Sequence, residues 1–234
     1  MGARPSDHNR RLARKMANVR PTVSDWRDGF LFAGNHLALD FLNTCPVQDG
    51  ERSEMLPDFD SVLRWFRAAG VLSSRQADDL KQRWGESARA RDFTARMREL
   101  REQLRSEILS WEGTGKLRRG TMDELNFIMA KHPMLTRLER DPSGMTTEFW
   151  FEARNPEDLF APLSQSAAML FAKVDPHRVR KCGHCVLHFY DTSKKGTRRW
   201  CSMQLCGNRL KVAAYAARQR VRAPRRYPMD DRQL

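Results

Sequence analysis

Four of the five cysteines fall in one segment of the chain, with a spacing that suits a metal ion. Two residues separate Cys182 from Cys185, and four separate Cys201 from Cys206. Two intervening residues form a tight knuckle that directs both sulfurs at one ion, and a strand-turn-strand of about fifteen residues returns the second pair. The spacing therefore predicts one structural zinc ion with four thiolate ligands.

Other interpretations of these cysteines are two disulfides, an iron–sulfur cluster and four unrelated thiols. Because we find no signal peptide, we expect a reducing compartment, in which disulfides are rare. A segment this small, with few large apolar residues, also needs a cross-link such as a bound metal ion in order to fold. His184 and His188 are less suitable ligands, since four thiolates already complete a tetrahedral site.

The residues around the cysteines predict the elements that position them. Turn-forming residues 191–196 lie between segments 187–190 and 198–200, which we expect to pair as a hairpin after the knuckle. Ser202 suits the N-cap of a final helix. Knuckle, hairpin and helix in this order predict a small treble-clef-like domain.

Positive charge is concentrated in the same part of the chain. The whole sequence has 42 Lys and Arg against 29 Asp and Glu, a formal net charge of +13. Residues 176–226 hold 14 of these cations and the single acid Asp191, which leaves 28 groups of each sign elsewhere. An imbalance confined to this segment predicts an anionic partner there, whereas the alternative is a solvated basic surface.

The predicted final helix separates an apolar stripe from a polar face when its residues are placed at about 100° each. An Asn side chain pairs with adenine, and Arg or Lys with guanine or phosphate, if such a helix enters a major groove. Arg209 lies beside the apolar stripe, so we expect a structural or phosphate contact from it. The polar face carries Asn208, Lys211, Tyr215, Arg218 and Arg222.

Four further cations lie on the predicted hairpin of this segment. Such side chains are expected to contact phosphates, because they have charge but no fixed geometry for reading bases. They are Lys194, Lys195, Arg198 and Arg199.

Two sequence segments resemble known families. WCSMQLCGNR, preceded by the first cysteine pair, resembles the CGNR zinc-finger family, whose name is spelled by residues 206–209. Upstream, FLFAGNHLALDFLNT over residues 30–44 is similar to the start of the ABATE domain that commonly precedes that finger. The resemblance covers most of the chain and implies a stress-induced transcriptional regulator of bacteria that binds DNA. It implies nothing firm about a small ligand.

These observations predict a mainly α fold with short β-hairpins (α+β). We expect a helical N-terminal domain and a treble-clef-like zinc finger at the C-terminus. The basic extension 1–28 is expected to be disordered; a transit peptide, a DNA-contacting arm and a variable extension are open interpretations of it. The other regions are an ABATE-like domain with two hairpins, 29–175, a CGNR-type finger, 176–226, and a tail, 227–234.

Apolar periodicity and capping residues predict the elements of the helical domain. Residues 30–32 and 37–41 are expected to pair as a hairpin around Gly34 and Asn35. A second hairpin is expected from residues 135–138 and 146–151. Helix starts are predicted at Asp58 or Asp60, at Ser73 or Ser74, at a capping box of Thr121 and Glu124, and at Asn155–Pro156. A long helix is predicted from the apolar stripe Phe93, Met97, Leu100, Leu104, Ile108 and Trp111.

Three polar residues stand in the apolar segment near the first predicted hairpin: Asp40, Asn43 and Thr44. Buried polar groups need partners, so these residues form either a capping network or the polar end of a ligand pocket. Cys45 beside them is most simply a packing residue.

The function favoured by the sequence is a DNA-binding transcription regulator, cytoplasmic and associated with the nucleoid. A small-molecule effector and a homodimer are open. An RNA-binding or ribosome-associated zinc protein is the alternative. A metal-dependent hydrolase is disfavoured, because a four-thiolate site has no open coordination position and no motif for hydrolysis accompanies it. No apolar run approaches the about 18 residues that a membrane span needs.

Overall fold

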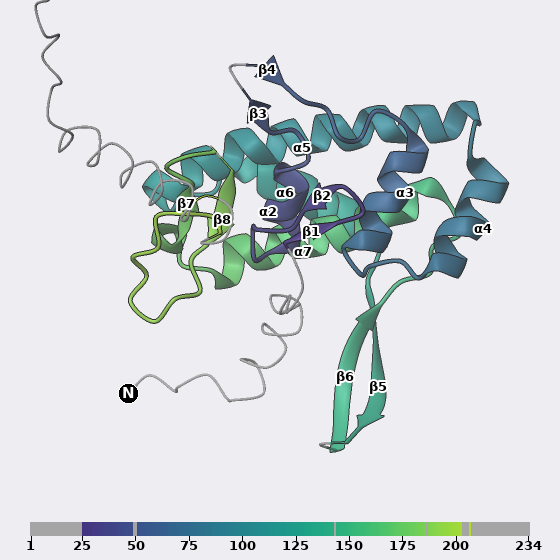
Figure 1. Ribbon diagram of the computed structural model, residues 1–234. Coiled ribbons are helices and arrows are strands. Elements are labelled where there is room, and N and C mark those ends of the chain that lie inside the picture. Colours follow the sequence, from purple (N-terminus) through teal and green to yellow (C-terminus); the bar gives the residue numbers. More distant parts are fainter. Residues whose placement is uncertain (1–24, 49–50, 143, 186, 203–205, 207–234) are drawn as a thin grey trace, which may run out of the picture. The chain divides into compact units, whose positions relative to one another are not determined.

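The computed structural model describes residues 25–48, 51–142, 144–185, 187–202 and 206 (Figure 1). The residues up to Cys201 belong to one unit, and Ser202 and Cys206 to a second. Most of the predicted basic extension and of the predicted final helix lies outside the described residues. No helix in the described part of the chain is long and apolar enough to cross a membrane.

The longest helix, α5 (Ala88–Thr114), confirms the helix predicted from the apolar stripe. The Ser87 hydroxyl accepts the Ala90 N–H at 3.1 Å at its start, and Gly115 follows its end with a left-handed φ of 66°. Spacings of three and four residues put the stripe on one side of the helix, and all its members are buried. They are Phe93, Met97, Leu100, Leu104, Ile108 and Trp111.

Helices α3 (Phe59–Ala68) and α4 (Ser74–Trp84) begin at predicted caps. The Asp58 carboxylate accepts the Ser61 N–H at 2.8 Å, and the Ser73 hydroxyl accepts the Gln76 N–H at 3.3 Å. Satisfying these otherwise unpaired N–H groups fixes where each helix starts.

Helix α2 (Leu37–Leu42) occupies the segment predicted as the second strand of the first hairpin, so that prediction is wrong. The hairpin instead pairs β1 (Trp26–Arg27) with β2 (Phe30–Leu31). A short apolar run does not distinguish a strand from a buried helix by periodicity. Here the surrounding core decides, because four side chains of α2 are at most 1 % exposed: Ala38, Leu39, Phe41 and Leu42.

Asp40 in α2 holds the chain segment that leads into this helix. Its carboxylate oxygen Oδ1 accepts the Gly34 N–H at 2.7 Å. A Cβ atom at position 34 would lie 2.8 Å from that oxygen, so this close approach requires glycine. Burial raises the pKa of Asp40 to about 7, although the hydrogen bond from Gly34 opposes the rise. The fold therefore favours the neutral carboxyl group.

A buried arginine ties α5 to the segment after α2. Arg101 is 2 % exposed and donates to both carboxylate oxygens of Glu54, at 2.8 and 2.5 Å. It also donates to the Thr44 hydroxyl at 3.0 Å. The short hairpin of β3 (Val47–Gln48) and β4 (Glu51–Arg52) lies between Thr44 and Glu54 in the sequence.

Helix α6 (Arg119–Lys131) begins before the predicted capping box of Thr121 and Glu124, so that box is wrong. The Thr121 hydroxyl donates to Glu107 of α5 at 2.7 Å. Glu107 is fully buried and also accepts the Arg118 N–H at 2.9 Å. The Thr121 hydroxyl thus bonds Glu107 of another helix instead of a backbone N–H of its own helix.

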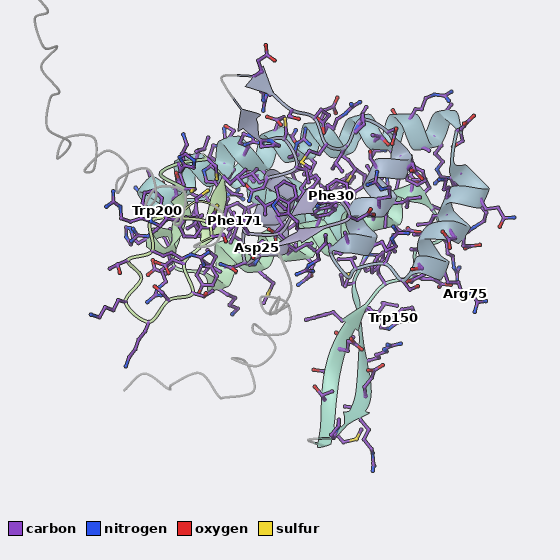
Figure 2. The ribbon with its side chains drawn as sticks, in the orientation of Figure 1. Asp25, Phe30, Arg75, Trp150, Phe171 and Trp200 are labelled. Atoms are coloured by element: carbon purple, nitrogen blue, oxygen red, sulfur yellow. The ribbon has the colours of Figure 1, made fainter. Side chains whose placement is uncertain are left out.

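The second predicted hairpin is confirmed as β5 (Leu135–Asp141) paired with β6 (Gly144–Trp150). Figure 1 shows this ribbon extending away from the helices, and Figure 2 places Trp150 where it joins them. The short 3₁₀ turn η1 (Pro156–Leu159) then leads into α7 (Phe160–Lys173), in agreement with the proline at the predicted helix start. Helix α7 packs against α2 and α6.

Replacing Asp40 by Asn should make the protein less sensitive to rising pH. The folded-state pKa of about 7 lies above the ordinary value of 3.8, so wild-type stability falls as the pH rises between these values. An Asn keeps an acceptor for Gly34 and never ionises. The free energy of unfolding of Asp40→Asn, relative to wild type, should rise by about 1 kcal/mol per pH unit in this window. Denaturant titrations at several pH values measure it.

The matched control is Asp123→Asn on the exposed side of α6, where the side chain is 64 % exposed. Its stability relative to wild type should change little over the same pH range, because this carboxylate is solvated in the folded and unfolded states. A flat difference for Asp40→Asn would contradict a neutral buried Asp40.

Candidate metal centre

The four predicted ligand cysteines come together. The sulfur atoms of Cys182, Cys185, Cys201 and Cys206 all lie within 4.8 Å of one another, with 3.4 Å between those of Cys185 and Cys201. Four thiolates around zinc at about 2.3 Å place neighbouring sulfurs about 3.8 Å apart. Three of the cysteines are buried and Cys185 is half-buried. The number, type and spacing of the donors therefore fit one zinc ion.

The donor set also determines what this zinc does. Four thiolates fill a tetrahedral site and leave no position for water or substrate, which is the arrangement of structural zinc. His184 and His188 lie outside the cluster. When bound, the ion cross-links the knuckle of residues 182–185 to the second cysteine pair.

The knuckle forms the turn of a hairpin. Strands β7 (Val179–Lys181) and β8 (His188–Tyr190) flank it and pair antiparallel. The predicted pairing of residues 187–190 with 198–200 is therefore wrong. The carbonyl of Arg199 instead accepts the N–H of Gly183 in the knuckle, at 3.1 Å. This bond places the residues just before Cys201 beside the knuckle.

The loop after β8 is organised by the single acid of the basic segment. Asp191 is fully buried, and its carboxylate accepts the N–H groups of Ser193 at 2.9 Å and of Arg198 at 2.7 Å. Burial raises the pKa of Asp191, but these hydrogen bonds and the nearby Arg180 outweigh it and hold the pKa below its usual value. Asp191 therefore remains charged and fixes both ends of the loop.

Two arginines also hold the loop that follows β8. One lies in β7 and the other in the turn before β7. Arg178, in the 3₁₀ turn η2 (Pro176–Arg178), donates to the carbonyls of Asp191 at 3.1 Å and Ser193 at 2.8 Å. Arg180 of β7 donates to the carbonyl of Gly196 at 2.7 Å. Part of the positive charge of the segment is thus used to shape its own backbone.

The four cations predicted to contact phosphates differ in their surroundings. Lys194, Lys195 and Arg199 are exposed. Arg198 is half-buried, donates to the carbonyls of Trp200 and Cys201, and lies 5.0 Å from the centroid of the Phe189 ring. These contacts give Arg198 a role in positioning the cysteine loop, whereas the lysines at the loop tip face solvent.

The outer edge of β8 is covered by the helical domain. The Asn43 side chain donates to the His188 carbonyl at 2.8 Å and accepts the His188 N–H at 3.0 Å, as a neighbouring strand would. The Tyr190 N–H donates to the Gly34 carbonyl at 2.8 Å, and the Asn35 side chain donates to the Tyr190 carbonyl at 3.0 Å. The first half of the finger is thereby fixed to the segment that contains α2.

These contacts give partners to the residues considered for a ligand pocket. Asn43 bonds β8, Asp40 bonds Gly34, and the Thr44 hydroxyl donates to the Phe41 carbonyl at 2.7 Å while it accepts from Arg101. None of three cavities in the described part of the chain, of about 410, 200 and 730 Å³, is lined by these residues. A pocket at this position stays a prediction.

The side chains of His188 and Glu112 also approach each other across this interface, but they form no hydrogen bond. Nε2 of His188 lies 3.8 Å from Oε2 of Glu112 on α5, and both atoms are buried without a hydrogen-bond partner among the described residues. Burial, with the charges of Arg105 and Lys181, lowers the pKa of His188 to about 4, and burial raises the pKa of Glu112. Burial thus disfavours the charged form of both groups, and the contacts that hold β8 at this interface are its hydrogen bonds to Asn43, Gly34 and Asn35.

Sequence reasoning missed several residues that build the site. The role of Asp191 could have been predicted from the sequence, because it is the one acid beside 14 cations in residues 176–226. Asn35 and Arg178 carried no such signal, since their partners are distant in sequence or lie in an irregular loop. The predicted helix face of Asn208, Arg209, Lys211, Tyr215, Arg218 and Arg222 lies outside the described residues.

We predict one zinc ion per chain, bound by the four cysteines. Zinc binding in such modules contributes about 10 to 16 kcal/mol of apparent folding free energy. Chelation should therefore unfold the finger and leave the helical domain folded, as followed by elemental analysis and circular dichroism. Absence of zinc, or iron with a visible charge-transfer band, would overturn the assignment.

Replacing Asn43 by Ala should loosen β8. The change leaves a buried N–H and a buried carbonyl of His188 unpaired, at about 1 to 3 kcal/mol each. We expect a loss of about 2 to 4 kcal/mol in denaturant titrations and faster hydrogen exchange of the His188 amide. Asn126→Ala on the exposed side of α6 is the matched control and should change neither measurement. Unchanged exchange at His188 in Asn43→Ala would contradict the role of Asn43.

Comparison with known families supports this organisation. Residues 35–174 match the ABATE family, described as "Putative stress-induced transcription regulator". Residues 178–219 match the CGNR zinc finger, which confirms both predicted resemblances. No curated protein matches the chain. Because the first match spans more than half of the 234 residues, the chain belongs to the ABATE family and carries a CGNR zinc finger.

Proposed function

We propose that this protein is a DNA-binding transcription regulator, in which the zinc finger contacts the duplex and the helical domain controls it. The observation that carries the proposal is the position of the charge. All of the net charge of +13 arises from residues 176–226, while the rest of the chain is neutral. Duplex DNA carries a dense row of phosphates, so a cationic surface confined to one small module suits it.

The loop of residues 191–198 supports the proposal further. Its backbone is held by Asp191, Arg178 and Arg180, while Lys194 and Lys195 at its tip are exposed. A loop that is already ordered loses little conformational entropy on binding, so its lysines retain more of their attraction for phosphate. This arrangement suits positioning of the finger on a nucleic-acid backbone rather than base recognition.

Sequence recognition is assigned in this proposal to the predicted final helix. Asn208, Lys211 and Arg218 share one predicted face, and their side chains match the hydrogen-bonding edges of adenine and guanine. The closed thiolate site supports a structural role for the finger and no catalytic one.

Binding titrations test the division between positioning and recognition. Lys194→Ala should weaken binding to all duplexes alike and reduce the slope of log affinity against log salt concentration by about 0.9. Asn208→Ala or Lys211→Ala should cost about 1 to 3 kcal/mol on the preferred duplex and much less on a random one. The preferred duplex is obtained by selection from genomic fragments, and each titration is repeated at two salt concentrations.

Lys116→Ala is the matched control, because this exposed lysine follows α5 in the neutral part of the chain. It should leave affinity and salt dependence unchanged. Equal losses on both duplexes for every helix-face variant would exclude sequence-specific recognition by that helix. Tighter binding to structured or single-stranded RNA than to any duplex would replace the proposal with an RNA-binding function.

A further inference from the structure

A cavity of about 410 Å³ lies where several elements of the helical domain meet. Helix α2, the turn between α3 and α4, the root of the β5–β6 ribbon and α7 all contribute to its wall. Small-molecule sites are typically cavities of about 300 to 1,000 Å³ with mainly apolar walls and a few polar groups. This cavity has the volume and the position, between elements distant in sequence, of such a site.

Two other cavities in the described part of the chain suit a small ligand less well. One has about 200 Å³, below the usual range for a ligand site. The other, of about 730 Å³, is lined by charged side chains that already pair with one another, such as Arg101 with Glu54 and Arg52 with Glu102. An incoming ligand would have to break those ion pairs.

The wall of the 410 Å³ cavity indicates which chemistry it accepts. Trp150, which is half-buried, provides aromatic surface on the same face of the ribbon as Glu148, because alternate residues of a strand share a face. Its two charged residues, Arg137 and Glu148, lie opposite each other on the ribbon and pair at 3.3 Å, while Arg137 also pairs with Glu139 at 2.6 Å and lies 5.9 Å from the Trp150 ring centroid. Because Arg137 already contacts two carboxylates, a charged ligand would compete with these ion pairs, whereas a neutral ring gains apolar contact with Trp150.

Polar contacts connect this cavity to the finger through α2. Leu37 of α2 and Ser166 of α7 line the cavity. Ser166 Oγ accepts the Ala38 N–H of α2 at 3.1 Å and lies 3.3 Å from Nδ1 of His36. Directly after the same helix, Asn43 holds β8 through His188. Helix α2 and the residue that follows it therefore contact both the cavity and the root of the finger.

We propose that the 410 Å³ cavity binds a small, neutral, ring-containing molecule, and that α2 transmits its occupancy to β8 of the finger. The ligand places its ring against Trp150 and directs a hydrogen-bonding group to Ser166 or Gln76 on the wall. This deepens the regulator function proposed above by naming its effector site. Binding and transmission are both measurable without DNA, so they fail independently of the DNA-binding proposal.

The binding test uses the neutral dye Nile red, whose fluorescence rises in apolar surroundings, with the zinc-loaded full chain. Wild type should bind one dye per chain. Val71→Trp, which fills the cavity from the turn between α3 and α4, should weaken binding by about tenfold or more. Leu109→Trp, at a site on α5 that is 46 % exposed and outside the cavity lining, is the matched control and should bind as wild type does.

Circular dichroism and zinc content verify that each variant is folded. If Val71→Trp fails to fold, Trp150→Leu replaces it and should also weaken dye binding, because it removes the aromatic wall at the end of β6. No binding by wild type, or equal binding by the cavity variants, would overturn the proposal. So would an anionic anilinonaphthalene sulfonate dye that binds the cavity as well as Nile red, because the wall would then not select neutral molecules.

Transmission is measured by hydrogen exchange at the amides of His188 and Tyr190, which donate to Asn43 and Gly34. Saturation with Nile red should change their exchange rates by about threefold or more, because the dye alters the freedom of α2. Asn43→Ala should still bind the dye but lose the effect at His188. Dye binding with unchanged exchange at both amides in wild type would refute transmission by α2.

Discussion

The junction between the finger and the helical domain depends on the backbone hydrogen bonds of β8. One edge of this strand pairs with β7, and its other edge meets Asn43, Gly34 and Asn35. An uncovered strand edge leaves N–H and carbonyl groups without partners, which is costly when the strand is buried. The Asn43 amide supplies the donor and acceptor of a peptide group without a further strand. The first cysteine pair is consequently fixed to the core through the hairpin that carries it.

The buried ionisable groups of the protein are of two kinds, those with hydrogen-bonding partners for their charge and those without. Arg101, Glu107 and Asp191 are buried charged groups, and each has several hydrogen-bonding partners. Asp40 and His188 lack an opposite charge in bonding contact, and burial shifts their pKa values towards the neutral form. An isolated buried charge is far costlier than a buried neutral polar group. The surface between α2 and β8 is therefore held by neutral hydrogen bonds, which depend on geometry and little on salt.

The positive charge of the finger is divided between internal contacts and the exposed surface. The guanidinium groups of Arg178, Arg180 and Arg198 donate hydrogen bonds to backbone carbonyls of the finger. Only part of the positive charge of the finger is therefore exposed to solvent. The exposed Lys194 and Lys195 lie on a loop whose backbone is fixed by hydrogen bonds to Asp191 and Arg178. Helix α2 lies between the attachment of β8 to the core and the 410 Å³ cavity, because Leu37 lines the cavity and Asn43 directly after the helix bonds β8.

The sequence alone determined the features that depend on local spacing. The cysteine intervals, the caps at Asp58 and Ser73 and the stripe of α5 are local, because a knuckle, a first helical turn and a helix face each involve residues close along the chain. Tertiary structure decided whether Leu37–Leu42 became a helix, since a short and almost wholly buried run has no periodicity that distinguishes a helix from a strand. It also decided that Thr121 bonds Glu107 rather than its own helix, and that β8 pairs with β7 and Asn43 rather than with residues 198–200. Those choices depend on hydrogen-bond partners that only the folded chain brings within reach.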